Sequence, residues 1–331
     1  MQAIQLPEYN HNVLRAMLSL RQVDLQNPEP DAGEVIVRMH ATTCNPSDIA
    51  FIRGGYNIVK PLPAIPGFEA SGTVATAGAG CEDLRGKMVS CFVQSHNSGT
   101  WAEYFRVRRE DLIEVDPQLD PDQAAAFSVN PFTAWGLITI ARERGSRAIL
   151  QNASGGQVAE FIRKLAGMND IRVIDIVRKP ATAEQLKKEN PYTLCETDED
   201  CNDRLRAMAE ELQATTAFDA VGGPLAGMMF NAMPRNGKMV VYGGLSGKRL
   251  TDLQEMDIIF RNKSVAGFNL IDWKEELEPG AYERITRELE MHFIKGSLAT
   301  RFQGTTTLEN LKEGLKSYLK EMSAGKLLIK P

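Results

Sequence analysis

The stretch QNASGGQVAEF (residues 151–161) follows the apolar run AIL (148–150) and predicts a glycine-rich turn between a β-strand and an α-helix. At such a turn the helix N-terminus presents free backbone amides, and glycine lets a phosphate group come close to them. Many α/β proteins use the same turn only to change the direction of the chain, so the stretch alone leaves both interpretations open. The surrounding sequence favours the nucleotide.

Strand-like and helical runs alternate on either side of this turn. Strands are expected at residues 148–152, 171–177, 217–221 and 238–242, and helices at residues 157–167, 182–188, 203–212 and 225–232. An alternation of this length implies a parallel sheet with right-handed crossovers. We therefore predict an α/β, doubly wound domain over residues 119–261.

The remaining sequence predicts a second, β-rich lobe. Up to residue 118, short alternating apolar runs are broken by Gly, Pro and Asn, as in a compact β lobe. Past residue 262 one strand candidate (264–270) and two helices precede the terminal run KLLIK (326–330). We expect this last strand to return to the first lobe, so residues 1–118 and 262–331 are predicted to form one domain.

Composition and charge are those of a globular protein without a polyanionic partner. The chain has 331 residues, 43% of them hydrophobic and 24% charged, and its formal net charge is −5. This charge gives no reason to expect nucleic acid or an anionic membrane as partner, and no apolar run approaches the roughly 20 residues of a membrane span. Residues 1–6 have the pattern of a short strand and not of a signal peptide. We expect a soluble, cytoplasmic protein that acts on a small molecule.

The five cysteines and four histidines show no pattern typical of a disulfide framework or a metal site. The sequence contains no C-x-x-C pair and no H-x-x-x-H pair. Neither a set of disulfides nor a zinc site is therefore predicted, and the thiols are expected to be reduced and mostly structural.

The sequence after the next strand indicates which coenzyme the glycine turn binds. An NAD-binding protein places Asp or Glu there to accept a hydrogen bond from the ribose 2′-hydroxyl, but this strand ends in Val177, Arg178 and Lys179. Two cations at that edge attract a 2′-phosphate, so we predict NADPH. Asp175 is the alternative acid, but it lies within the strand, and we interpret it as structural. Val158 replaces the third glycine of the fingerprint, whose role is helix packing and not phosphate contact.

Six motifs, in this order, resemble the medium-chain dehydrogenase/reductase superfamily over nearly the whole chain. They are CNPSD (44–48), PAIPGFEASGTV (63–74), NPFTA (130–134), VGG (221–223), YGG (242–244) and AGK (324–326). Within that superfamily the chain is similar to the zinc-independent quinone oxidoreductases and, more narrowly, to the 2-enoyl thioester reductases. The narrower match rests on QNAS (151–154), IVR (176–178) and FNLIDW (268–273). The resemblance implies a doubly wound Rossmann domain plus a GroES-like, β-rich catalytic lobe.

The resemblance also bears on zinc. Zinc-dependent members of the superfamily bind the catalytic metal through a Cys three positions before the Asp and a His inside G-H-E. This chain has Asn45 and Phe68 at these positions, with Cys44 one residue away from the first of them. The four-cysteine structural lobe has no counterpart around residues 95–99. A tetrahedral site cannot be assembled from these residues, so no metal is predicted.

The resemblance further implies roles for individual residues. Tyr56 aligns with the tyrosine placed over the substrate, where it would hold the thioester oxygen or help protonate the α-carbon; burial for packing is the alternative. Trp273 matches a pocket tryptophan, with interface or core packing as its alternative. Asn45 is expected to act both in catalysis and beside the nicotinamide. The other coenzyme-binding residues implied are Thr133, Ser154, Gly155, Gly156, Gln157, Arg178, Lys179, Tyr242, Gly243, Gly244, Phe268 and Asn269.

The expected chemistry follows from the missing metal ligands. Reduction of a simple carbonyl benefits from a Lewis acid, whereas hydride addition to a conjugated C=C spreads charge into an enolate that hydrogen-bond donors can stabilise. We therefore predict an NADPH-dependent reductase of an activated double bond such as a 2-enoyl thioester. A quinone or alkenal reductase is the first alternative, and a catalytically quiet dinucleotide-binding protein is the second. The resemblance implies structural roles for Asp48 and Glu69 and a homodimer joined near residues 264–270.

Overall fold

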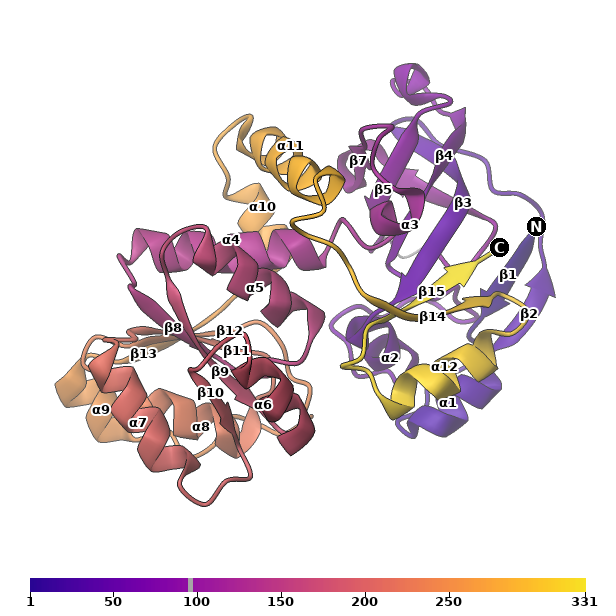
Figure 1. The fold of residues 1–331 in the computed structure, drawn as a ribbon. Coiled ribbons are helices and arrows are strands. Elements are labelled where there is room, and N and C mark those ends of the chain that lie inside the picture. The colour runs from indigo at the N-terminus through magenta and orange to yellow at the C-terminus, as the bar shows by residue number, and fades with distance from the viewer. Residues whose placement is uncertain (95–97) are drawn as a thin grey trace. The chain divides into compact units, whose positions relative to one another are not determined.

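The computed structural model describes residues 1–94 and 98–331 (Figure 1). The chain divides into two compact units. One unit consists of residues 1–130 and 280–331, and the other of residues 131–279. Each unit has an extended sheet of its own.

The unit of residues 131–279 is built on a parallel sheet of six strands. In spatial order these are β10 (Thr193–Cys195), β9 (Arg172–Val177), β8 (Ala148–Gln151), β11 (Thr216–Asp219), β12 (Lys238–Val241) and β13 (Ser264–Gly267). The strand order reverses between β8 and β11, which is the switch point of a doubly wound dinucleotide-binding fold. The predicted Rossmann domain is thereby confirmed.

Helices connect these strands and cover both faces of the sheet. They are α4 (Asn130–Glu143), α5 (Gln157–Gly167), α6 (Pro180–Lys187), α7 (Cys201–Glu211), α8 (Gly223–Ala232), α9 (Glu255–Arg261) and α10 (Leu270–Glu275). Helix α5 lies on one face, and α7, α8 and α9 lie on the other (Figure 1). This double cover explains why every residue of β8 and β11 is buried. Leu150, Ile174 and Phe230 are fully buried in the core between the sheet and α8.

The other unit is rich in antiparallel strands, as predicted for the catalytic lobe. A small sheet pairs β1 (Gln2–Gln5) with β2 (Arg21–Asp24). The large sheet has the order β14 (Phe302–Thr307), β15 (Lys326–Lys330), β3 (Glu34–Cys44), β4 (Glu69–Ala77), β5 (Met88–Phe92), β7 (Leu112–Glu114), and β6 (Tyr104–Arg108) also pairs with β3. Because β15 pairs with β3, the predicted return of the last strand to the first lobe is confirmed.

Short helices surround this sheet. They are α1 (Val13–Ser19), α2 (Pro46–Ile52), α3 (Pro121–Ala124), α11 (Ala281–Ile294) and α12 (Leu311–Lys320), with 3₁₀ turns η1 (Glu82–Leu84) and η2 (Arg109–Asp111). The core includes Phe51, Phe68, Trp101 and Phe105. Asp120 caps α3 as predicted, because its carboxylate accepts hydrogen bonds from the first helical amides. In residues 1–94 and 98–331, no helix of either unit has the length and apolar character needed to cross a membrane.

Residues 262–279 differ most from the expectation drawn from the sequence. Strand β13 pairs with β12 and so continues the parallel sheet, which groups these residues with 131–261. The strand predicted at 264–270 is too long: it ends at Gly267, because the Asn269 side chain accepts a hydrogen bond from Ile271 N–H at 2.8 Å and starts α10. The sequence predicts a catalytic domain (1–118 and 262–331) and an NADP-binding domain (119–261). The functions assigned to these two domains remain predictions.

Candidate functional site

The glycine turn joins β8 to α5, as predicted. Ala153 has a left-handed backbone (φ 50°), and its carbonyl accepts a hydrogen bond from Gly156 N–H at 2.8 Å. Gly156 is the N-cap of α5, and a Cβ at this position would lie 3.1 Å from the same carbonyl. The turn therefore leads directly into a helix N-terminus, where backbone amides and the helix dipole favour an anion.

The side chain of Ser154 is used inside the protein. Its hydroxyl donates to the carbonyl of Gln151 at 3.1 Å and accepts from Ile176 N–H at 3.1 Å. Its N–H also donates to the carbonyl of Ile176, at 3.3 Å, so both the side chain and the amide of the serine tie the turn to β8 and β9. Gln157, also predicted to bind the coenzyme, is buried at the first position of α5.

Asp175 is a buried structural acid, in agreement with the interpretation from the sequence. The residue is fully buried, and its carboxylate accepts hydrogen bonds from Gln151 Nε2 at 2.7 Å, Arg163 Nη1 at 3.1 Å and Asn190 Nδ2 at 2.8 Å. A carboxylate held by three protein donors is poorly placed to accept from a ribose hydroxyl.

Arg178 and Lys179 lie where the sequence predicts a phosphate-binding edge. Strand β9 ends at Val177, and Arg178 follows directly with an exposed side chain. Lys179 is the N-cap residue of α6 and is partly buried. At the end of this strand, therefore, the guanidinium of Arg178 is exposed to solvent, whereas the carboxylate of Asp175 is buried.

A second polar network lies at the switch point between β8 and β11, and the sequence analysis missed it. Asn152 donates to the Asp219 carboxylate and accepts from Ala220 N–H at 2.8 Å. Asp219 also accepts from the N–H groups of Val221 and Gly222, at 3.0 Å each. Both side chains are fully buried, so the network fixes the strand ends beside which doubly wound folds bind ligands. The available signal was a polar residue at the end of each of two apolar runs.

The residues after β12 show why glycine is needed there. Tyr242 N–H donates to the carbonyl of Asp219 at 2.9 Å. A Cβ at Gly243 would lie 2.9 Å from the carbonyl oxygen of Ala220, closer than real Cβ contacts allow. Gly244 is exposed. The predicted rim along the ribose therefore consists of backbone packed closely against β11.

Phe268 and Trp273 pack against helix α4 of the same unit. Their ring centroids are 6.1 Å apart, and a Cβ at Gly136 would lie 2.6 Å from Phe268 and 3.0 Å from Trp273. This contact supports the packing alternative for Trp273. Thr133 is buried on α4, and Asn269 caps α10.

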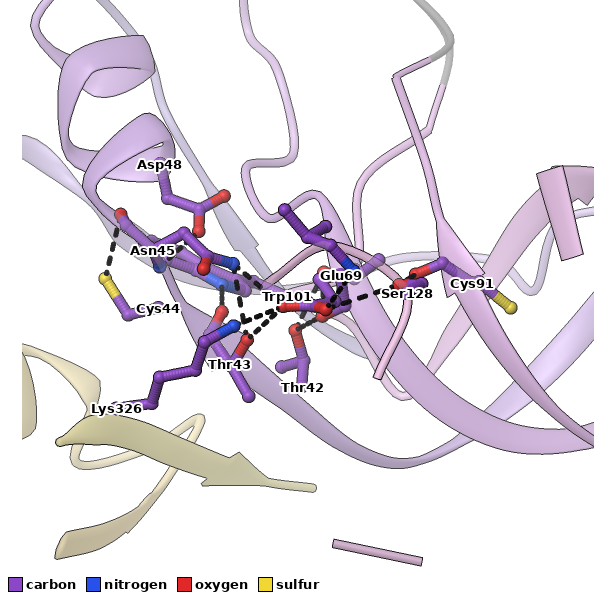
Figure 2. A network of polar contacts seen from close by, with 12 residues as sticks. Thr42, Thr43, Cys44, Asn45, Asp48, Glu69, Cys91, Trp101, Ser128 and Lys326 are labelled. Carbon is purple, nitrogen blue, oxygen red and sulfur yellow. Dashed lines mark hydrogen bonds and ion pairs between the residues drawn. The ribbon is translucent and has the colours of Figure 1, made fainter. Parts of the chain in front are cut away.

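In the other unit, the carboxylate of Glu69 is the centre of a buried hydrogen-bond network (Figure 2). Its Oε2 accepts from Lys326 Nζ at 2.6 Å, Asn45 Nδ2 at 3.1 Å and Thr43 Oγ1 at 3.2 Å. Its Oε1 accepts from Val129 N–H at 2.9 Å. Glu69 is fully buried and Lys326 nearly so, which keeps water from screening the ion pair. Glu69 thus has the structural role that the resemblance implied.

Asp48 and Asn45 begin helix α2. Asn45 is the N-cap residue, and its N–H donates to Asp48 Oδ2 at 2.6 Å, as expected for a capping acid. The other oxygen, Oδ1, is buried without a hydrogen-bond partner in the part of the chain that the structure describes. Burial is the main reason that the pKa of Asp48 rises to about 7, and Glu69 adds to the rise while Lys326 opposes it.

Tyr56 and a buried lysine, Lys60, both lie close to the ring of Phe68. The ring of Tyr56 is 5.3 Å from that of Phe68, and burial raises the pKa of its hydroxyl. Lys60 Nζ lies 5.3 Å from the centroid of the Phe68 ring and donates to the carbonyl of Ser98. Burial lowers the pKa of Lys60 to about 8. The sequence analysis missed Lys60, although a cation inside the apolar run IVKPLP (58–63) was a signal.

Both parts of the chain resemble known protein families. Residues 31–117 match the family model for the alcohol dehydrogenase GroES-like domain, and residues 156–287 match the model for zinc-binding dehydrogenase. The chain belongs to the medium-chain dehydrogenase/reductase superfamily. It is thus a member of an oxidoreductase superfamily, and the suspected family is confirmed.

Individual relatives of this superfamily are similar over most of the chain. The human mitochondrial enoyl-[acyl-carrier-protein] reductase is 26% identical over 317 residues, which cover 93% of this chain and 84% of the human protein. The bovine protein of the same name is 29% identical over 273 residues, 80% of this chain and 72% of that protein. A putative NADPH:quinone reductase from Mesorhizobium loti has a similar structure, with a TM-score of 0.94, 28% identity and coverage of 100% of this chain and 98% of the other.

Although one family model is named for zinc, the residues around Phe68 do not fit that metal. Phe68 is a hydrocarbon, the amide of Asn45 donates to Glu69, and Lys326 already supplies a cation to that carboxylate. Burial raises the pKa of Cys44 well above its ordinary value, which disfavours a thiolate. Residues 1–94 and 98–331 contain no cluster of three or more His, Cys, Asp or Glu side chains that could hold a metal ion. Residues 95–97, part of the stretch predicted to lack a cysteine lobe, lie outside the described residues.

The Glu69–Lys326 pair predicts a large effect on stability. Lys326→Met leaves a buried carboxylate without its cation, so the free energy of unfolding should fall by about 3–5 kcal/mol. Lys330→Met is the control on the same strand, because its partner Asp122 is 36% exposed and the change should cost no more than about 1 kcal/mol. Urea unfolding of both variants measures the difference, and similar losses would contradict the assigned role.

Asp48 predicts a pH dependence of stability. Its pKa of about 7 in the folded protein exceeds the ordinary 3.8, so the folded state retains a proton that the unfolded chain releases between these values. The free energy of unfolding should therefore fall as the pH rises from about 4 to about 7. Asp48→Asn keeps an acceptor for Asn45 and should remove this contribution. Urea titrations across that pH range that show an unchanged slope in the variant would contradict the assignment.

Proposed function

We propose that this chain uses NADPH to reduce the activated C=C bond of a 2-enoyl thioester, without zinc. The observation that carries the coenzyme assignment is the contrast at the end of β9, where Asp175 is buried among three donors and Arg178 is exposed. A guanidinium can bind a 2′-phosphate through two parallel hydrogen bonds. Lys179 adds a second cation beside it.

The residues of the parallel-sheet unit fit a dinucleotide. Backbone amides in the first turn of α5, which follows the glycine turn of Ser154, Gly155 and Gly156, would hold the pyrophosphate, and the backbone at Gly243 and Gly244 would border the ribose. When bound, NADPH supplies the hydride. We propose coenzyme contacts in the same way for Asn45, Thr133 and the other residues that the resemblance implies.

The side chains of the β-rich unit fit reduction of a conjugated double bond. One hydride goes to the β-carbon of the substrate, and one proton goes to the α-carbon of the enolate that results. A tyrosine hydroxyl is protonated near neutral pH at its ordinary pKa, and burial raises the pKa of Tyr56 further, so this hydroxyl can donate a hydrogen bond to the enolate oxygen. Phe68, which packs on Tyr56, offers an apolar surface and no metal ligand.

The relatives support both the enoyl thioester and one alternative. Curated relatives are named as enoyl-[acyl-carrier-protein] reductases, whereas solved structures from Mesorhizobium loti and Bacillus thuringiensis are described as putative NADPH:quinone reductases. A quinone or alkenal reductase is therefore the second candidate. The curated enoyl-[acyl-carrier-protein] reductases cited are mitochondrial by name, and a cytoplasmic location for this chain stays a prediction from its sequence.

Stopped-flow measurement of NADPH absorbance tests the proposal. Crotonyl thioester, 1,4-benzoquinone and a 2-alkenal are compared at equal concentration. We expect the highest kcat/KM with the crotonyl thioester. Preference for the quinone or the alkenal would favour the second candidate, and turnover of none of the three would favour a catalytically quiet dinucleotide-binding protein.

Arg178→Asp should separate the two coenzymes. The variant places a negative charge where the 2′-phosphate is expected, so KM for NADPH should rise at least about tenfold while KM for NADH changes little. Arg172→Asp is the matched control, because Arg172 is an exposed arginine at the opposite end of the same strand. Equal effects of the two variants on NADPH, or a wild-type preference for NADH, would refute the coenzyme assignment.

We also propose a homodimer through the outer edge of the parallel sheet. Strand β13 ends the sheet, and an unpaired strand edge is a natural site for pairing with a second copy. Next to it on the chain, α9 exposes Ile259 and Phe260, by 63% and 66%. Light scattering should give a dimer for the wild type and a monomer for Val265→Lys combined with Phe260→Ser. Leu14→Lys, at an exposed leucine of the other unit, is the control and should remain a dimer.

A further inference from the structure

Arg163 links the glycine turn to the buried acid of the neighbouring strand. It lies in α5, two turns after the N-cap, and only 16% of its side chain is exposed. Its Nη1 donates to the carbonyl of Ser154 at 2.8 Å and to Asp175 Oδ1 at 3.1 Å. One guanidinium therefore contacts both the turn that would receive the pyrophosphate and the buried acid of β9, two residues before that strand ends.

The contact with Ser154 bears on how the turn presents its amides. In a trans peptide the carbonyl and the N–H of the same peptide unit point in opposite directions. Because the Ser154 carbonyl points to Arg163, the N–H of Gly155 points away from it. The hydrogen bond thus fixes the direction of an amide in the turn just before α5, next to the helix N-terminus where an anion would bind.

The contact with Asp175 determines whether a negative charge near the predicted 2′-phosphate site is balanced. Asp175 lies two residues before the end of β9, which is about 7 Å along the strand and within the range over which a partly buried charge acts. Gln151 and Asn190 also donate to this carboxylate, but both are neutral amides. The positive charge within hydrogen-bond distance of Asp175 in the described residues comes from Arg163.

We propose that Arg163 is a positioning residue that makes the site accept a 2′-phosphorylated coenzyme. It neutralises Asp175, which would otherwise repel the 2′-phosphate, and it holds the Ser154 peptide in the orientation that the pyrophosphate needs. This proposal rests on the proposed use of NADPH. It adds a residue that belongs neither to the glycine turn nor to the predicted phosphate-binding pair, Arg178 and Lys179.

Coenzyme binding in four variants tests the charge effect. Fluorescence titration should show that Arg163→Met raises Kd for NADPH about tenfold and raises Kd for NADH clearly less, because only NADPH carries the phosphate. Asp175→Asn keeps an acceptor for its partners but removes the charge, so the double variant with Arg163→Met should regain the wild-type ratio of the two Kd values. Arg163→Lys should also keep that ratio, whereas Asp175→Asn alone leaves the charge of Arg163 uncompensated and should shift the ratio toward NADPH.

A matched control separates positioning from general stability. Arg144 is another arginine of the same unit, and it donates to Thr216 Oγ1 and to the carbonyls of Thr215 and Asn236 at the opposite end of the strands. Arg144→Met should lower stability without changing either Kd. In Arg163→Met, kcat at saturating NADPH should stay within about twofold of the wild type, because the substituted group does not touch the reacting atoms.

Hydrogen exchange without coenzyme tests the hold on the turn independently of the proposed function. The amides of Gly155 and Gly156 should exchange faster in Arg163→Met than in Arg144→Met. Unchanged exchange, an equal loss of affinity for both coenzymes, or a double variant that does not regain the ratio would overturn the inference. A wild-type protein that prefers NADH would instead overturn the proposed function, which makes the two failures distinguishable.

Discussion

The buried carboxylate of Glu69 is the constraint on which the β-rich unit depends. A charge without water must be met by donors and a counter-ion, and Lys326, Asn45, Thr43 and Val129 supply them. These groups come from widely separated parts of the chain, and Glu69 and Lys326 are 257 positions apart. The return of β15 to β3 therefore completes an ion pair as well as a sheet.

The ion pair of Glu69 and Lys326 also affects which reaction the β-rich unit suits. Where related dehydrogenases that bind zinc would need a histidine, this chain has Phe68, and the acid next to it already has an internal cation. The unit thus offers Tyr56 as a neutral donor beside an apolar ring. Such a surface suits delocalised charge better than charge concentrated on one oxygen, which is why an activated double bond is the proposed substrate.

Periodicity in the sequence was enough to predict β8, β9, β11 and β12 of the parallel sheet, because buried strands and amphipathic helices leave strong local patterns. It missed the short strand β10. It overextended the strand at 264–270, since capping by Asn269 is a side-chain event that hydrophobicity does not report. Motif positions predicted the turn at Gly156 and the role of Arg178. They did not predict the partners of Asp175, because Arg163 and Asn190 contact it only once the chain is folded around β9. Lys60 was missed because burial of a lysine is decided by tertiary contacts.

We propose that Lys326 balances the charge of Glu69 in the β-rich unit and that hydride transfer by this chain needs no bound metal. The most direct measurement is the zinc content of purified protein by mass spectrometry, made on the same sample whose NADPH-dependent turnover of crotonyl thioester is recorded before and after chelation. The account predicts turnover without stoichiometric zinc and no loss on chelation. Stoichiometric zinc whose removal abolishes turnover, and whose return restores it, would contradict the account.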